Sequence, residues 1–341
     1  MKKLAIAAAV AAMATAASAQ NVSVYGVIDT TVQSFKADSA SAVTRSQDNI
    51  YATSRIGFRG TEDLGGGLKA NFQLEGRVRP SAGTAGSATA NQTFSRESWL
   101  GLSGSFGEIR AGLTDLSQQQ GMDGLAAPRA GGFGDIPVNG TSIEIGTDST
   151  NAVRYISPSV AGLQIEVGHS TGNGVDATTD ANASVDSVSA IYRSGNFRAG
   201  IGHSRLDATT TVAKRDGTTY AVGYDFGFAN VGLVYAKGDN SATADVDSKA
   251  MTASVSVPLG SGVEAHGVYG TSENGSSTTD NKGKGYTVAL VKDLSKRTKV
   301  YTHYTSVTND ANSSMTMTGT TAPAAAGGDT KVYGVGISHT F

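Results

Sequence analysis

Two neighbouring side chains could belong to a hydrolase. His203 and Ser204 are adjacent, and aspartates that could complete a catalytic triad are frequent. A triad requires a nucleophile, a base and an orienting group that converge on one point. The five histidines are scattered over segments that share no motif. The sequence therefore does not support hydrolytic chemistry, and we expect the protein not to be an enzyme.

The acidic loops are a weak candidate for cation binding. Asp245-Val246-Asp247 is a single Asp-x-Asp in a loop rich in Ser, Thr and Asp, which is typical of a solvated loop. Cysteine is absent and no histidines have metal-ligand spacing, which argues against a transition-metal site. No helical pattern follows Gly65-Gly66-Gly67, so this is a turn rather than a phosphate-binding loop. We expect no metal and no cofactor.

The elements that must position any functional side chain are short alternating segments. In 68–75, Leu, Ala, Phe and Leu alternate with Lys, Asn, Gln and Glu, and 22–33 and 333–341 alternate in the same way. With a side-chain period of two, one face of each strand is polar or small and the other is apolar. No segment after residue 19 approaches 18 consecutive apolar residues, so membrane helices are not expected.

The N-terminus has the order of a secretory leader. Lys2 and Lys3 precede an apolar stretch from Leu4 to about Ala16, and Ala17-Ser18-Ala19 is a small-residue cleavage pattern. We therefore expect residues 1–19 to be a signal peptide and residues 20–341 to form one β-barrel domain.

The connections between the alternating segments are short and long in turn. The short ones, rich in Gly, Asn and Ser, are 63–67, 104–106, 157–162, 195–196, 227–229, 259–261 and 294–296. The long ones are roughly 36–49, 77–93, 114–149, 171–185, 206–216, 238–247, 272–283 and 308–330. Seven short turns and eight long loops predict 16 antiparallel strands in an outer-membrane β-barrel. A barrel of this size leaves an aqueous channel.

Composition excludes several other classes of protein. The net charge is −2, which gives no sign of nucleic-acid binding. The 44 glycines and only 6 prolines fit many strands and tight turns rather than a disordered chain. A soluble β-sandwich or propeller is the competing architecture, but no repeat of roughly 40–50 residues is visible.

Several blocks of sequence resemble a known family. They are 24–29 (Val-Tyr-Gly-Val-Ile-Asp), 54–70 (from Ser-Arg-Ile-Gly-Phe-Arg-Gly to Leu-Lys-Ala), 99–104, 151–155 and 294–298. In order and spacing, the chain resembles the trimeric general porins of Gram-negative bacteria, specifically their betaproteobacterial branch. The aromatic end of the chain, Phe341, resembles the signal that the outer-membrane assembly machinery reads. The resemblance implies a 16-stranded barrel, a homotrimer and a third loop folded into each pore.

The third long connector, Thr114–Ser149, fits this role because connections of such length are usually functional. Members of the family often carry Pro-Glu-Phe-Gly-Gly here, whereas this chain has Gly131-Gly132-Phe133-Gly134-Asp135. Arg129 is its one basic residue. Its acidic residues are Asp115, Asp123, Asp135, Glu144 and Asp148, of which we select Asp115, Asp123 and Asp135 as candidates for the constriction.

Arginines on the strands are candidates for the opposite wall. A charge facing lipid costs roughly 2–4 kcal/mol at mid-bilayer, so strand charges should face the lumen or lie near an interface. Arg55 and Arg59, four residues apart, share one face, and Arg77 and Arg79 begin the second loop. The candidates are Arg55, Arg59, Arg77, Arg96, Arg110 and Arg154. A basic wall facing an acidic loop would create a transverse field and favour anions.

The sequence thus predicts an outer-membrane protein that passes ions and small hydrophilic solutes without energy input. Its partners would be outer-membrane lipid, two further copies of the chain and the solutes, with no nucleic acid. Two alternatives remain: a substrate-specific channel on the same scaffold, and a structural or adhesive barrel with no open pore.

Overall fold

The computed structural model describes residues 21–38, 41–85, 92–117, 125, 133, 138–139, 145, 148–172, 183–208, 214–240, 247–273, 281–317 and 326–341. The predicted signal peptide lies outside the described residues. Among the described residues, helices long and apolar enough to cross a membrane are absent.

Sixteen long strands form the barrel. They are β1 (Asn21–Ala37), β3 (Arg55–Gly65), β4 (Leu68–Arg79), β6 (Glu97–Gly104), β7 (Gly107–Thr114), β9 (Ser149–Ile156), β10 (Leu163–Ser170), β11 (Val185–Ser194), β12 (Phe197–Leu206), β13 (Arg215–Asp225), β14 (Asn230–Asn240), β15 (Asp247–Gly260), β16 (Val263–Glu273), β17 (Lys282–Asp293), β18 (Thr298–Asn309) and β20 (Thr330–Thr340). Four short strands lie in the long connectors: β2 (Val43–Asp48), β5 (Thr84–Ala85), β8 (Val138–Asn139) and β19 (Met315–Thr316).

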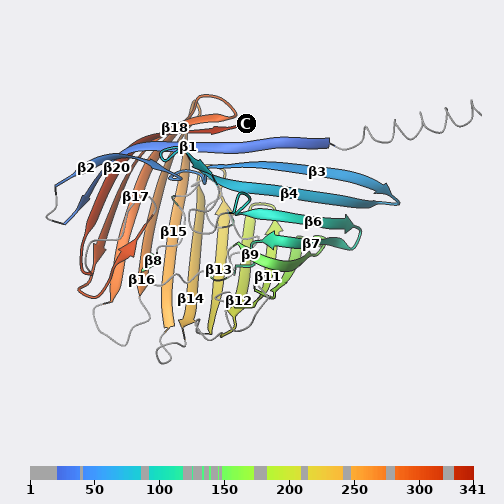
Figure 1. Ribbon diagram of the computed structural model, residues 1–341. Helices are drawn as coiled ribbons and strands as arrows, with labels where there is room; N and C mark the ends of the chain where they lie inside the picture. The colour runs from blue at the N-terminus through green and yellow to red at the C-terminus, as the bar shows by residue number, and fades with distance from the viewer. Residues whose placement is uncertain are drawn as a thin grey trace, which may run out of the picture.

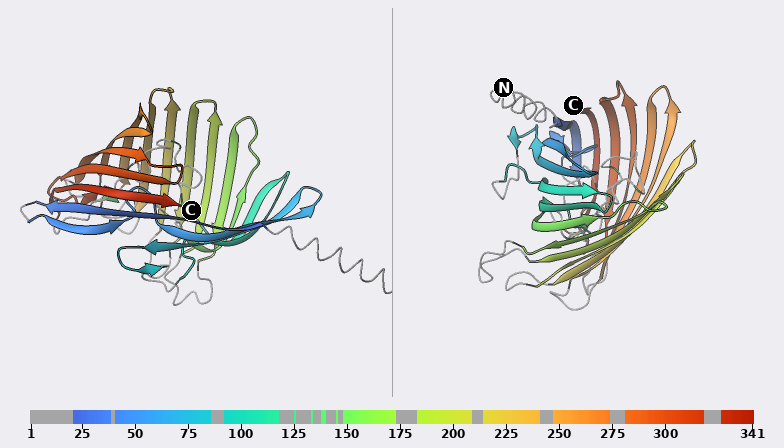
Figure 2. Two further views of the ribbon diagram at one scale, coloured as in Figure 1. Left: turned by 90° about the horizontal axis from the view of Figure 1, so that it is seen from above. Right: turned by 90° about the vertical axis from the view of Figure 1, so that its right-hand side faces the viewer.

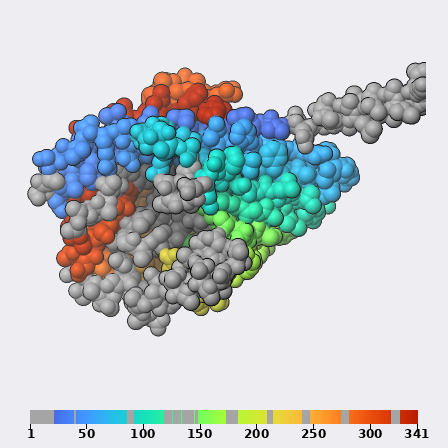
Figure 3. All heavy atoms as spheres, in the orientation of Figure 1, coloured from blue at the N-terminus to red at the C-terminus, as the bar shows by residue number. Residues whose placement is uncertain are grey.

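The barrel closes where the first strand, β1, pairs with the last strand, β20. Every long strand pairs antiparallel with the next one, and β1 pairs with both β3 and β20. The backbone of Phe341 also exchanges two hydrogen bonds with Gly26, N···O 3.1 and 3.0 Å. The first strands (blue) therefore lie beside the last (red), and the strands curve around a common interior (Figures 1 and 2). In the space-filling view, the blue and red surfaces adjoin (Figure 3). The predicted closed 16-stranded antiparallel barrel is confirmed.

Along each strand, large apolar side chains on the outer face of the barrel alternate with smaller, more polar side chains on its inner face. On β17, Tyr286, Val288 and Leu290 point outward and are exposed, whereas Thr287 and Ala289 between them are buried. An outer face of this kind, with aromatic residues near both rims, matches the hydrocarbon layer of a membrane.

The turns follow the predicted plan. All seven short connections join consecutive strands, and in the first of them Gly65, Gly66 and Gly67 have φ of +84°, +62° and +82°. Residues with a Cβ atom rarely adopt such φ values, which explains three consecutive glycines here. One boundary was wrong: Arg77 and Arg79 do not begin a loop but complete β4, whose ladder with β3 runs as far as the Arg55–Arg77 pair.

The described residues of the third connector contact the inner wall at three successive places. Leu116 packs with Ala152 of β9 and Val185 of β11. Leu125 packs with Ile191 of β11 and Ala221 of β13. Phe133 packs among residues of β16, β17 and β18, such as Val268, Val291 and Val307. All three connector side chains are almost fully buried, so these described residues of the connector lie inside the barrel.

Two side chains of β12 bind the backbone of this connector. The Ser204 hydroxyl donates to the Leu116 carbonyl at 2.8 Å, and Arg198 Nε donates to the Leu125 carbonyl at 3.0 Å. Hydrogen bonds to a buried carbonyl inside the barrel replace those that water would otherwise make. The connector is therefore held by both apolar and polar contacts.

Candidate pore constriction

Strand register brings the predicted arginines together on one arc of the inner wall. Arg55 of β3 lies directly opposite Arg77 of β4, and Arg110 of β7 lies directly opposite Arg154 of β9. Like charges in directly opposed positions are destabilising, so each pair needs counter-charges. The carboxylates that supply them determine the electrostatics of the lumen.

Glu75 of β4 is the counter-charge of two arginines. One of its oxygens accepts a hydrogen bond from Arg96 Nε at 2.6 Å, and the other lies 3.5 Å from Arg55 Nε. The Tyr25 hydroxyl donates to Glu75 at 2.8 Å. Burial alone would lower the pKa of the Arg96 guanidinium, but the bond to Glu75 and its charge raise that pKa above its ordinary value. Arg55 and Arg96 thus share Glu75, and Glu97, directly opposite Glu75, also acts on Arg96.

The carboxylate is recessed behind its arginines. The Glu75 side chain is 7% exposed, whereas the Arg55 and Arg96 side chains are 31% and 26% exposed. A solute in the lumen therefore meets the guanidinium groups first. Exposed guanidinium groups in front of a recessed carboxylate bring positive charge closest to the solute path.

Two further arginines of the arc have one carboxylate partner each. Arg77 pairs with Asp148, which ends the third connector, at 2.7 Å. Arg110 pairs with Glu108 two residues earlier on the same face of β7, also at 2.7 Å, and its guanidinium lies 4.1 Å from the centre of the Trp99 ring. Stacking on an indole face stabilises a cation and fixes the direction of its side chain.

Arg154 is the most buried member of the arc. It pairs with Glu166 of β10 at 2.5 Å, and both side chains are less than one-tenth exposed. Its other terminal nitrogen donates to the backbone carbonyl of Asp115 at 3.4 Å. Burial raises the pKa of the Asp115 carboxyl above its usual value, against the opposing effects of hydrogen bonds from Ser117 and the charge of Arg154. Arg154 therefore fixes the start of the connector rather than presenting a charge to solutes.

The remaining candidates are divided. Arg59 lies on the inner face of β3, where Nε donates to Ser23 Oγ at 3.4 Å and the guanidinium lies 4.9 Å from the centre of the Tyr25 ring. Asp123 and Asp135 lie outside the described residues. Arg96, predicted on a strand, comes one residue before β6 begins. The structure thus brings Arg55, Arg77 and Arg96 together around Glu75 and Asp148. Arg110 and Arg154 are instead paired with other carboxylates, Glu108 and Glu166.

Three carboxylates of the inner wall have no distinctive pattern in the sequence. Glu75, Glu108 and Glu166 were not selected, although Glu75 shares a strand face with the polar residues of 69–73. Alternation alone would have placed Glu75 in the lumen. Its pairing with Arg55 and Arg96 depends on register, which a single sequence does not give.

The side chains that could have indicated other chemistry are not assembled for it. Ser204 points inward and is buried, whereas His203 points outward and contacts Thr218 at 3.0 Å. Adjacent strand residues face opposite sides, so these two cannot act together. In the described part of the chain, clusters of three or more potential metal ligands are absent.

A closed barrel with an apolar outer face, a charged inner wall and an internal loop defines a membrane channel of the outer-membrane type. The family model for Gram-negative porins matches residues 5–312. The chain therefore belongs to the Gram-negative porin family. It is an outer-membrane porin, a class of passive channels rather than enzymes.

Individual relatives agree with this assignment. The chain is 30% identical to outer membrane porin protein 32 of Delftia acidovorans over 100% of both sequences. It is 35% identical to the major outer membrane protein P.IB of Neisseria gonorrhoeae over 48% of this chain and 46% of that one. The anion-selective porin from Comamonas acidovorans has a TM-score of 0.80 at 26% identity, covering 94% of this chain and 100% of that structure. The Salmonella typhi OmpF structure, at 14% identity and a TM-score of 0.67, supports the fold alone.

Proposed function

We propose that the protein is a general diffusion channel for ions and small hydrophilic solutes, with a preference for anions at its constriction. The observation that carries the preference is the recessed Glu75 behind the more exposed Arg55 and Arg96. The exposed guanidinium groups lie nearer the solute path than the recessed carboxylate, and the low-dielectric wall strengthens their field. The Comamonas acidovorans structure, described as anion-selective, supports the same assignment by similarity.

The constriction is proposed to lie between this arginine arc and the third connector. Arg55, Arg59, Arg77 and Arg96 are the wall residues closest to solutes in this proposal, and Asp115, Asp123 and Asp135 belong to the facing connector. Arg110 and Arg154 are assigned to supporting the arc, because Trp99 and Glu166 hold them in place.

We also propose that the working form is a homotrimer. The family resemblance implies it, and a Vibrio cholerae OmpT structure of the same fold is described as a trimer form. In a planar bilayer, the protein should give large ohmic conductance steps that arrive in threes. Single steps of equal size would contradict the trimer but not the channel. A silent membrane with folded, inserted protein would indicate a non-conducting barrel, and block of the current by one solute class would indicate a substrate-specific channel.

Removal of residues 1–19 completes the proposal. The Ala17-Ser18-Ala19 pattern places the cleavage before Gln20. N-terminal sequencing of protein from outer membranes should begin at Gln20, and a start at Met1 would contradict the leader assignment.

A further inference from the structure

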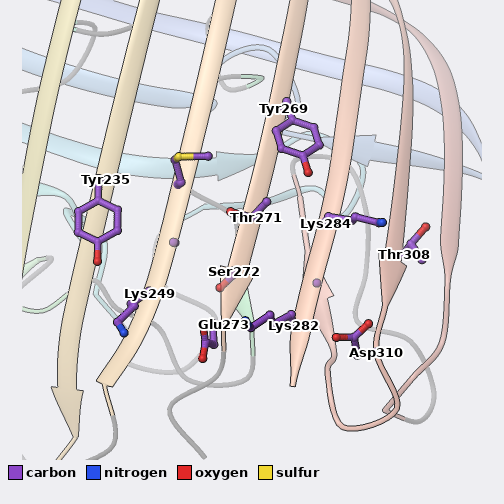
Figure 4. Close-up of a pocket in the computed structure, with 13 residues that line it drawn as sticks. Tyr235, Lys249, Tyr269, Thr271, Ser272, Glu273, Lys282, Lys284, Thr308 and Asp310 are labelled. Atoms are coloured by element: carbon purple, nitrogen blue, oxygen red, sulfur yellow. Dashed lines mark ion pairs between the residues drawn. The ribbon is translucent and has the colours of Figure 1, made fainter. Parts of the chain in front are cut away.

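A groove lies on the outer face of the barrel, at the long-loop ends of β14–β17. It encloses about 490 Å³, and its lining includes Lys249, Lys282, Lys284, Tyr235 and Tyr269. Figure 4 shows Lys249, Glu273 and Lys282 close to the strand ends, with Tyr235 and Tyr269 farther along the strands. This groove is separate from the lumen and has no part in the pore described above.

Strand register arranges these lysines in a row. Lys237 of β14 is opposite Lys249 of β15, Lys249 is opposite Glu273 of β16, and Glu273 is opposite Lys282 of β17. Directly opposed side chains lie within roughly 5.5 Å at Cβ, so the three lysines and one glutamate form a continuous stripe across four strands. Lys284 is the next outward-facing residue after Lys282 on the same strand, one position farther from the long loops.

The next outward-facing row toward the membrane centre consists of Tyr235, Met251, Thr271 and Lys284, and the row after it includes Tyr269 and Tyr286. On β14, Tyr235 is two residues from Lys237, and on β15, Met251 is two residues from Lys249. The same spacing recurs in Lys284-Gly285-Tyr286 on β17 and in Lys331-Val332-Tyr333 on β20. In every case the lysine is nearer the long loops, although β14 runs opposite to β15, β17 and β20. The order is therefore fixed in space rather than by chain direction.

Location sets the depth of this stripe in the membrane. Tyr269, Tyr286 and Tyr333 are exposed on the outer face, and their rings occupy the position of an aromatic girdle, which lies at the level of lipid head groups. Lys284 lies one outward position, and Lys249 and Lys282 two, from these rings toward the long loops, at the level of the charged parts of those head groups. Long loops of such barrels are extracellular, so the leaflet concerned is the outer one.

The lysines have acidic neighbours: Asp239 and Asp247, which lie opposite each other, are one outward position from Lys237 and Lys249 toward the long loops. Glu273 lies 3.7 Å from Lys282 and is the carboxylate within the stripe, and Asp310 is the other acidic group lining the groove. The Lys282 side chain remains 67% exposed. An ammonium group has three donors, so a carboxylate contact leaves donors available for a second anion. Phosphate, with several strong acceptor oxygens, fits such a cluster.

We propose that this groove binds a phosphorylated, acylated lipid of the outer leaflet. Lys249, Lys282 and Lys284 hold its phosphate, and Tyr235, Met251 and Tyr269 contact the first part of its acyl chains. Free phosphate would use the lysines alone, whereas a lipid uses both the lysines and the apolar floor. The groove faces the membrane along its whole length, so a lipid reaches it without leaving the bilayer.

The test uses the intact, detergent-solubilised barrel and bisphosphorylated lipid A as the probe. Native mass spectrometry should show the lipid retained on the wild type. The K249Q/K284Q double variant should bind it about thirtyfold more weakly, because each lysine near an anionic membrane surface contributes about fivefold. Channel conductance should be unchanged in the double variant. Unchanged conductance would show that the barrel of the variant is folded.

Lys292→Gln is the matched control, since Lys292 lies on the same face of β17 at the short-turn end. It should bind the lipid like the wild type, and inorganic phosphate should not displace the lipid. Wild-type affinity in the double variant would overturn the proposal. An equal loss of lipid binding in the Lys292 variant would mean that any lysine on the outer face attracts the lipid, without a specific site. Full displacement of the lipid by inorganic phosphate would mean that the groove binds free anions instead.

Discussion

Replacing Phe133 with alanine should raise the single-channel conductance and the current noise. The Phe133 ring is 1% exposed and lies in a cluster of rings, with centroid distances of 5.9 Å to Tyr51, 5.9 Å to Tyr301 and 5.7 Å to His303. Removing a buried phenylalanine side chain costs about 3–5 kcal/mol. The lost packing energy weakens the contact between the third connector and the barrel wall. The barrel itself is held by the pairing of its sixteen strands, so it should remain folded.

Single-channel recording checks this result. Phe228→Ala is the matched control, since Phe228 lies in a short turn and is 73% exposed. It should conduct like the wild type. A Phe133→Ala channel with wild-type conductance and noise would mean that Phe133 does not anchor the connector. A retained barrel signature in circular dichroism and on unheated gels excludes unfolding as the cause of any change.

Neutralising Arg96 and neutralising Glu75 should shift the ion preference in opposite directions. Arg96→Gln removes one of two cations around Glu75, whereas Glu75→Gln removes the anion they share. A charge about 8 Å from a passing ion contributes about 2 kcal/mol at an effective dielectric constant of about 20, and 0.1 M salt reduces this by roughly half. We expect each variant to change the permeability of each ion about fivefold, in opposite directions for anion and cation. The anion-to-cation ratio then falls for Arg96→Gln and rises for Glu75→Gln.

Reversal potentials of the two variants provide the measurement. Arg205→Gln is the control, because Arg205 is exposed on the outer side of β12 and pairs with Asp207 at 2.9 Å. It removes the same charge without changing the lumen. Shifts in the same direction for the Arg96 and Glu75 variants would show that the two side chains do not act through the charge they leave in the pore.

The fold was largely predictable because a membrane barrel imposes a simple pattern. Alternation with period two gave the strands, and the sequence of short and long connections gave their number and antiparallel order. The turn at 65–67 was recognisable because consecutive glycines permit positive φ. Short strands inside the long connectors, such as β2 and β19, were not predicted, since two to six residues carry too little periodicity.

The candidate site was predictable only in part. Alternation places Arg55 and Arg59 on the inner face, but it does not say that Arg55 lies opposite Arg77 or that Glu75 lies between Arg55 and Arg96. Those contacts depend on the register of β3 with β4 and on the path of the segment before β6. The predicted arginine wall is therefore an ion-paired network, in which exposure rather than the number of charges determines what a solute meets.

The reversal potential of the unmodified channel, measured with salt unequal across the membrane, tests the central claim most directly. The salt should be one whose two ions have similar mobility in water, so that the sign reports the pore. The recessed Glu75 and the exposed Arg55 and Arg96 predict a potential of the sign that anion preference gives. A potential near zero, or one of the sign that cation preference gives, would contradict the assignment of these arginines to the constriction.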